Sequence, residues 1–287
     1  MHYVDEQPLG AQEESPTLLF VHGNPTWSFH WRAAIKHFRK AYRCVAPDHL
    51  GCGLSDKGAP PQSLADRIGQ LIAFVEALDL QRVTLVAQDW GGAIGLGAMQ
   101  SMPERLEQIV LFNTGAFPPP FFPWRIRVCR TPLLGRIALQ GFNVFSQAAL
   151  SMTTSRMRKL APEAAKGYLA PYDSWNNRQA VYDFVADIPA TPRHPTWQTL
   201  LDVESGLPAL AELPVCLIWG MQDWCFRPEC LERFLAIWPE ARVARLTDVG
   251  HWVMEDAPEE AITQIESFLA ESSASSAAPA ASPANQT

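Results

Sequence analysis

The sequence predicts an α/β fold in which a mostly parallel sheet is flanked by helices and interrupted by an inserted helical cap. Short apolar runs alternate with amphipathic segments in the first 114 residues. This alternation stops between residues 115 and 205 and resumes from 206 to 270. We therefore expect a core formed by residues 1–114 and 206–270, a cap formed by residues 115–205, and a disordered tail at 271–287, which is rich in Ser, Ala and Pro.

The first half of the core contains the clearest elements. Buried strands are expected where short apolar runs end in turn residues, at 17–21, 42–47, 82–87 and 106–113. Helices are expected between them, at 29–40, 64–78 and 92–101. The helix at 64–78 has the strongest signal, because its apolar positions share one face and Ser63 stands at its N-cap position. Residues 2–5 are expected to form a strand at a sheet edge.

The second half of the core repeats the same pattern after the cap. Strands are expected at 215–219 and 242–246, and helices at 228–238 and 258–270. The cap itself has no buried-strand run, but it has helical patches and two Pro clusters, at 118–120 and 189–195. Crossovers through helices of this length give a parallel sheet covered on both faces.

Composition excludes several classes of function. A net charge of −7 and a pI near 5.5 argue against a nucleic-acid partner, which requires a basic surface. No apolar run approaches the roughly 18 residues of a membrane span, and the N-terminus lacks the layout of a signal peptide. The six cysteines have no paired C-x-x-C spacing, so neither a zinc site nor a disulfide framework is indicated. A cytoplasmic protein is expected.

Residues 87–92, Ala-Gln-Asp-Trp-Gly-Gly, lie between a predicted strand and a predicted helix. They match the form small-x-nucleophile-x-small-small, the nucleophile elbow of α/β-hydrolases. Small residues are needed there because the sharp turn brings the strand and helix backbones together. Asp89 holds the nucleophile position. The alternative explanation is an ordinary strand–helix turn, since Asp is a favoured N-cap.

Three further signals follow other predicted strands. Residues 22–25, His-Gly-Asn-Pro, suit a loop whose backbone N–H stabilises an oxyanion. Asp223 follows a late strand, and His251 follows the last one. Each is equally well explained by a simple turn, but their chain order (nucleophile, acid, base) is that of α/β-hydrolases. Together they predict a catalytic triad of Asp89, Asp223 and His251.

The combination of Asn24, Asp89-Trp90, Asp223 and His251 resembles the haloalkane dehalogenases of the α/β-hydrolase fold, over residues 3–270. An Asp nucleophile, an Asp acid and an Asn–Trp halide pair are similar to one subgroup, which is close to the bacterial β-lactone decarboxylases of olefin biosynthesis. In some relatives the acid follows the fourth strand. No Asp or Glu lies between residues 107 and 163, so that alternative is closed here.

The resemblance implies a haloalkane dehalogenase, a hydrolase that converts carbon–halogen bonds to an alcohol and a halide ion. Asp89 would displace the halide and form an alkyl ester. Asn24 and the Trp90 indole would bind the halide, and backbone N–H groups would hold the oxyanion. His251, oriented by Asp223, would activate water. The expected partners are a small apolar halogenated substrate and halide; no metal or organic cofactor is needed.

Other functions compete with this one. In a β-lactone decarboxylase, the same Asp89 would open the lactone and the ring carboxylate would occupy the halide donors before CO₂ leaves. An epoxide hydrolase would need an acid such as Tyr168, Tyr172 or Tyr182 from the cap. Fluoroacetate dehalogenases have Arg at the position of Trp90, so a small charged substrate is not expected for this chain. A non-catalytic binding protein of this fold usually lacks the nucleophile or the base, and both are present here.

The cap segment between residues 108 and 162 is basic and apolar. It has no acid, although the protein is acidic overall. Its basic residues are Arg125, Arg127, Arg130, Arg136, Arg156, Arg158 and Lys159. Its apolar stripe comprises Leu133, Leu134, Ile137, Ala138, Gly141, Phe142 and Phe145. One interpretation packs the stripe over the active site; the other makes the segment a surface for self-association or membrane contact.

Overall fold

The computed structural model describes residues 1–8, 15–131, 133–156 and 159–277. It confirms the predicted fold class: seven strands form one sheet in the order β1-β3-β2-β4-β5-β6-β7. All neighbouring strands are parallel except β1 and β3, and β1 lies at the predicted edge. The strands are β1 (Tyr3–Glu6), β2 (Thr17–Val21), β3 (Arg43–Pro47), β4 (Val83–Asp89), β5 (Leu106–Thr114), β6 (Val215–Gly220) and β7 (Arg242–Leu246).

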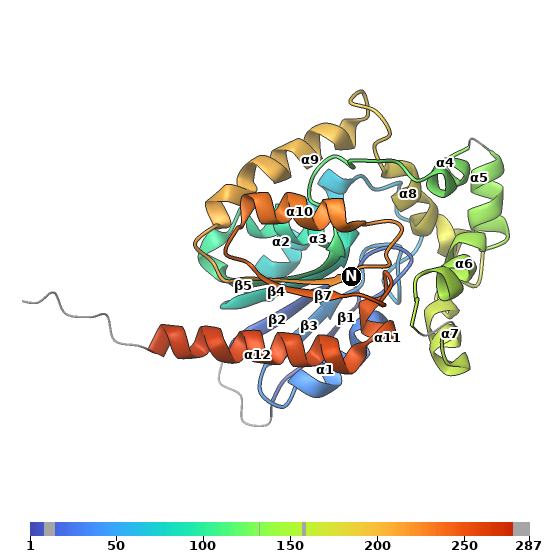
Figure 1. Ribbon diagram of the computed structural model, residues 1–287. Helices are drawn as coiled ribbons and strands as arrows, with labels where there is room; N and C mark the ends of the chain where they lie inside the picture. Colours follow the sequence, from blue (N-terminus) through green and yellow to red (C-terminus); the bar gives the residue numbers. More distant parts are fainter. Residues whose placement is uncertain (9–14, 132, 157–158, 278–287) are drawn as a thin grey trace, which may run out of the picture.

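Helices cover both faces of the sheet (Figure 1). One layer holds α2 (Leu64–Ala77), α3 (Trp90–Met99), α9 (Pro195–Gly206) and α10 (Pro228–Ile237). The opposite layer holds α1 (Arg32–Phe38), α11 (Val253–Asp256) and α12 (Pro258–Ala277). Short turns of 3-10 helix are η1 (Ser28–Trp31), η2 (Pro103–Arg105), η4 (Asn176–Arg178) and η5 (Leu207–Leu210). Within the described ranges, no helix combines the length and apolarity needed to cross a bilayer.

The apolar runs form strands because both of their faces are buried. In β2, Leu19 and Val21 join the core cluster under α2 and α3, whereas Leu18 and Phe20 join the cluster under α1 and α12. Such two-sided burial explains why the run is continuously apolar rather than alternating. Helix α2 begins with a complete capping box, in which Ser63 and Asp66 bond each other's backbone N–H.

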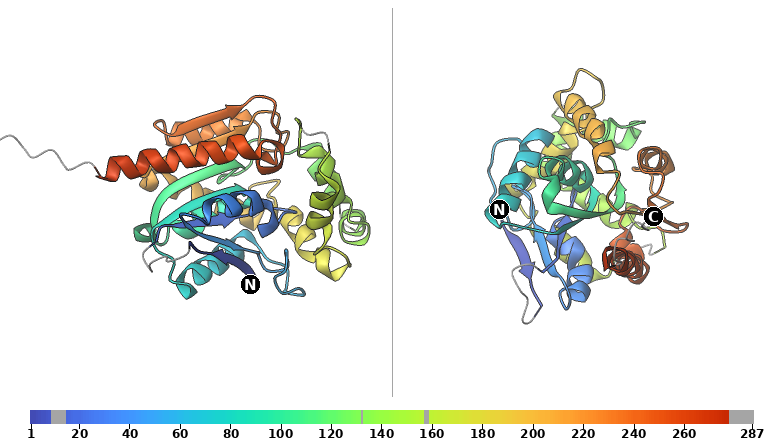
Figure 2. Two further views of the ribbon diagram at one scale, coloured as in Figure 1. Left: turned by 90° about the horizontal axis from the view of Figure 1, so that it is seen from below. Right: turned by 90° about the vertical axis from the view of Figure 1, so that its left-hand side faces the viewer.

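The cap lies beyond the carboxyl ends of the central strands (Figures 1 and 2). It contains α4 (Trp124–Cys129), α5 (Leu134–Arg136), the π-helical turn η3 (Ile137–Gly141), α6 (Val144–Met152), α7 (Pro162–Leu169) and α8 (Gln179–Asp187). Helix α9 instead packs against α2 and α3 of the core. The cap therefore covers the end of the sheet at which the predicted site residues emerge.

One sequence expectation is wrong at the C-terminus. The disordered tail was expected from residue 271, but helix α12 continues to Ala277. Ala, Glu and Ser tolerate a helix that is already nucleated, and no Pro interrupts the segment between Pro258 and Pro279. Residues 278–287 lie outside the described part of the chain.

Alanine substitutions at Gly91 in the elbow and at Gly69 in α2 test how tightly the elbow is packed. A Cβ on Gly91 would lie 2.2 Å from the Val21 carbonyl oxygen, whereas one on Gly69 would meet nothing within 4 Å. We expect Gly91→Ala to lower the free energy of unfolding by roughly 1–3 kcal/mol, because backbone must move. Gly69→Ala, in the exposed interior of α2, should raise it by about 0.5–1 kcal/mol. Urea denaturation of both variants checks this, and equal effects would contradict it.

Candidate active site

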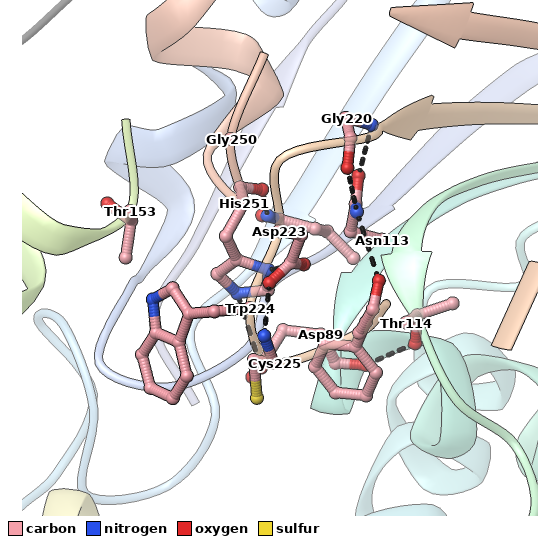
Figure 3. Close-up of polar contacts among 12 residues, drawn as sticks. Asp89, Asn113, Thr114, Thr153, Gly220, Asp223, Trp224, Cys225, Gly250 and His251 are labelled. Carbon is pink, nitrogen blue, oxygen red and sulfur yellow. Dashed lines mark hydrogen bonds and ion pairs between the residues drawn. The ribbon is translucent and has the colours of Figure 1, made fainter. Parts of the chain in front are cut away.

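The elbow is built where β4 turns into α3. Asp89 has φ 54° and ψ −130°, an uncommon backbone conformation for a residue with a Cβ. The turn is held by Thr114 at the end of β5, whose hydroxyl donates a hydrogen bond to the Asp89 carbonyl (Figure 3). Gly92 faces this threonine, and a Cβ there would lie 2.0 Å from its hydroxyl oxygen. Glycine is therefore required at position 92, because any larger side chain would overlap Thr114.

The structure brings the predicted triad together (Figure 3). His251 Nδ1 lies 2.7 Å from Asp223 Oδ2, and its Nε2 lies 3.5 Å from Asp89 Oδ2. The other nucleophile oxygen, Asp89 Oδ1, accepts a hydrogen bond of 2.8 Å from the backbone N–H of Asn24. One oxygen thus accepts a backbone hydrogen bond, and the second faces the histidine.

Two residues that sequence reasoning missed hold the acid in place. The Asn113 side chain accepts a 2.7 Å hydrogen bond from the Gly220 N–H and donates a 2.9 Å bond to the Gly220 carbonyl. These two hydrogen bonds tie the ends of β5 and β6 together just before Asp223 (Figure 3). The Cys225 N–H donates to Asp223 Oδ1 at 2.6 Å. The sequence signal that could have identified Asn113 is a polar residue near the end of an otherwise apolar strand segment.

His251 is held in its protonated form by the two carboxylates. Burial alone would lower its pKa, but the charge and hydrogen bond of Asp223, with those of Asp89, outweigh burial and raise the pKa to about 10. His251 is therefore an imidazolium at neutral pH in the free protein. It lies between two carboxylates, and each of them raises its pKa.

The loop that carries His251 is anchored from both sides. Gln88, adjacent to the nucleophile, donates to the His251 carbonyl at 2.5 Å. From the cap, the Thr153 carbonyl accepts a 2.9 Å bond from the Trp252 N–H. The cap and the nucleophile strand therefore set the position of the histidine together.

The predicted halide donors lie beside Asp89. One amide N–H of Asn24 donates to the Val181 carbonyl of α8 at 3.1 Å, which leaves the second N–H of that amide available. Trp90 lines the adjoining cavity together with Asn24. Its indole N–H has no acceptor among the described residues, so it is free to bind an anion.

Two apolar cavities meet at Asp89. One has a volume of about 110 Å³ and the other of about 290 Å³. Both are lined by Asn24, Asp89, Ile126, Phe145 and Cys225. The first continues along Trp90, Phe117, Phe121, Phe122 and Leu200. The second continues along Val144, Met152, Trp224 and His251. Asp89 thus stands at the junction of two apolar arms.

Cys225 lies at this junction without competing as a nucleophile. Burial, reinforced by the charges of Asp223 and Asp89, raises the pKa of its thiol well above the usual value. The thiol therefore stays protonated and does not compete with the Asp89 carboxyl group that faces the same cavities. Among the described residues, no cluster of His, Cys, Asp and Glu has the grouping that a metal ion requires.

The cap tyrosines are occupied elsewhere. The Tyr168 hydroxyl donates to Glu255 Oε1 at 2.6 Å and lies 2.8 Å from His30 Nδ1. The Tyr172 hydroxyl donates to the Thr26 carbonyl at 3.3 Å. Neither of these, nor Tyr182, lines the two cavities. The acid that epoxide opening would need is therefore not positioned at Asp89.

Comparisons with known proteins identify the family of this chain. The model of the alpha/beta hydrolase family matches residues 18–264. A cis-3-alkyl-4-alkyloxetan-2-one decarboxylase of Shewanella oneidensis is 38% identical, over 94% of this chain and 85% of its own. Haloalkane dehalogenase 2 of Mycobacterium bovis is 33% identical, over 90% and 87%. The structure of an ancestral haloalkane dehalogenase superposes with a TM-score of 0.84 at 29% identity, covering 95% of this chain and 96% of that one.

The proposed role of Asp223 as the acid can be tested by measuring the pKa of His251. We expect Asp223→Asn to lower the His251 pKa by roughly one to three units, because one of the two anions is lost. NMR titration of ring-labelled histidine measures this. Asp248→Asn, which changes an exposed carboxylate near the same loop, is the matched control and should leave the pKa unchanged. An unaltered value in Asp223→Asn would remove Asp223 from the triad.

Proposed function

The chain belongs to the alpha/beta hydrolase family, to the group that includes haloalkane dehalogenases and β-lactone decarboxylases, and we propose that it converts dialkyl β-lactones to an alkene and carbon dioxide. The observation that carries the proposal is the junction of two apolar cavities at Asp89. Identity to the decarboxylases supports it, at 38% and 35% against 33% for a dehalogenase.

The shape of the cavities suits a two-chain substrate. An oxetan-2-one, a four-membered β-lactone, that is alkylated at C3 and C4 sends two chains away from adjacent ring carbons. Each chain can enter one apolar arm while C4 faces Asp89 at the junction. A simple haloalkane has one chain and fills a single arm. The second arm therefore favours the lactone.

In the first step, Asp89 Oδ2 attacks C4 of the lactone. The Oδ2–C4 bond forms as the ring C4–O bond breaks, and its electron pair goes to the ring oxygen. The product is an ester of Asp89 that carries a free carboxylate on C3. The unused amide N–H of Asn24 and the Trp90 indole N–H are the donors that would bind this carboxylate.

In the second step, the ester collapses without water. The bond between C3 and the carboxylate carbon breaks, its electron pair forms the C3–C4 double bond, and the C4–O pair returns to Asp89. Backside attack leaves the carboxylate antiperiplanar to the Asp89 oxygen, so no bond rotation is needed and a cis lactone gives a cis alkene. No proton is transferred, and His251 can remain an imidazolium throughout.

Dehalogenation, the main prediction from the sequence, is the second candidate. It is favoured by the Asn24 N–H on Asp89 Oδ1, the position at which an oxyanion forms when water attacks an alkyl ester. Esterification also removes the Asp89 charge that raises the His251 pKa. The histidine then loses its proton more readily and can serve as the base that activates water.

The two reactions place different demands on His251. With 1-bromobutane, we expect His251→Phe to accumulate a stable adduct equal in mass to one butyl group, because ester hydrolysis needs the base. With a cis-dialkyl β-lactone, the same variant should release alkene and accumulate no adduct. Intact-protein mass spectrometry and gas chromatography of the alkene provide the two readouts.

The controls separate the outcomes. Asp89→Asn should form no adduct and no alkene, and His251→Gln should repeat the result if the phenylalanine variant is unstable. If the wild-type protein releases bromide but no alkene, the proposed decarboxylation is wrong and dehalogenation is the activity. A lactone adduct that persists in His251→Phe without alkene would contradict collapse without a base.

A further inference from the structure

Exposed apolar side chains are concentrated on one part of the cap. Of the eleven large hydrophobic side chains that are exposed among the described residues, seven lie between residues 124 and 144. The most exposed are Trp124 at 70%, Leu133 at 72%, Leu134 at 71% and Phe142 at 70%. We call this region, residues 124–144, the α4–α5 surface. Single exposed hydrophobic residues are ordinary, but a cluster indicates an interaction site.

The packing interpretation of the apolar stripe is therefore wrong for most of its length. Phe145 lines both cavities, whereas Leu133, Leu134 and Phe142 face outward. The reason is local geometry: α5 is three residues long and passes directly into the π-helical turn η3. A π turn has more residues than an α turn, so the positions that share a face in a continuous α-helix separate.

The same surface is positively charged. Arg125, Arg127, Arg130 and Arg136 form no ion pair with any carboxylate in the described part of the chain, and residues 108–162 contain no acid. Arg156, by contrast, is paired with Asp248 and Glu260 of the core. Lys159 is exposed outside the surface, and Arg158 lies outside the described residues. Four arginines that lack an ion pair within the described residues therefore lie together on the α4–α5 surface.

Helix α4 separates this surface from the substrate cavities. Its buried Ile126 lines both cavities, and Arg125 lines the second. Trp124, Arg127 and Val128 of the same helix are exposed to solvent. One short helix therefore has a cavity wall on one side and a cationic, apolar surface on the other.

We propose that the α4–α5 surface docks on an anionic lipid bilayer, with its apolar side chains at the interface and its arginines against lipid phosphates. Tryptophan and arginine are the residue types that anchor proteins at this boundary. Charge complementarity selects an anionic surface although the whole chain carries −7. Docking would hold the cavity wall beside a reservoir of apolar substrate. It depends on the surface alone and is independent of which reaction Asp89 performs.

A matched pair of double variants tests the proposal. Leu134→Ser/Arg127→Glu changes the surface outside the residues that line the cavities. Leu54→Ser/Arg193→Glu makes the same chemical changes elsewhere, at a leucine that is 60% exposed. Each protein is sedimented with phosphatidylcholine vesicles, alone or with phosphatidylglycerol added, at low and high salt. We expect wild type to bind only the anionic vesicles, with binding weakened by salt.

The surface variant should lose binding by at least about tenfold, since it combines a charge inversion with a lost apolar anchor. The control variant should bind as wild type does, and both should keep wild-type turnover of a water-soluble substrate. Wild-type protein that ignores anionic vesicles, or a surface variant that still binds them, would overturn the proposal. Self-association that only the surface variant loses, without vesicle binding, would assign the surface to a second copy of this chain instead.

Discussion

The buried negative charge of Asp89 is the constraint on which the rest of the site depends. The residue is only 9% exposed and faces apolar cavities, where an uncompensated carboxylate would be costly. Two interactions compensate it: the Asn24 N–H on one oxygen and the His251 imidazolium facing the other. In the proposed reaction, forming an ester consumes this charge and changes both partners. The His251 imidazolium then faces one carboxylate instead of two and loses its proton more readily, and the Asn24 N–H can stabilise an oxyanion.

The fold supplies these partners from separate strands whose carboxyl ends meet at one edge of the sheet. Asn24 follows β2, Asp89 ends β4, and Asp223 and His251 follow β6 and β7. Asn113 and Thr114 at the end of β5 then bond to Gly220 and Asp89, so this strand links the turns that carry Asp223 and Asp89. Packing of the elbow against β2 leaves no space for a Cβ, and this closeness brings Asn24 to the nucleophile.

The core was predictable from sequence because its strands are buried on both faces and its site residues sit at strand ends. Asp89, Asp223 and His251 could be placed together from the elbow motif, their positions after strands and their order in the chain. The cap was not predictable in the same way. The orientation of Leu133 and Leu134 depends on a π turn, the two cavities depend on how the helices pack, and the role of Asn113 depends on a neighbour about one hundred residues away in sequence. Helix α12 extends beyond its predicted end, because the Ser and Ala residues that follow residue 270 oppose the extension of an existing helix only weakly.

The central claim is that Asp89 forms an ester and that the substrate decides how the ester is resolved. Multiple turnover in ¹⁸O-labelled water, followed by mass spectrometry of the peptide that contains Asp89, tests it most directly. After turnover of 1-bromobutane, hydrolysis at the ester carbonyl should leave ¹⁸O in the Asp89 carboxylate. After turnover of a cis-dialkyl β-lactone to alkene, the peptide should remain unlabelled. Alcohol formation without label in Asp89 would contradict the ester, and label introduced by lactone turnover would contradict its collapse without water.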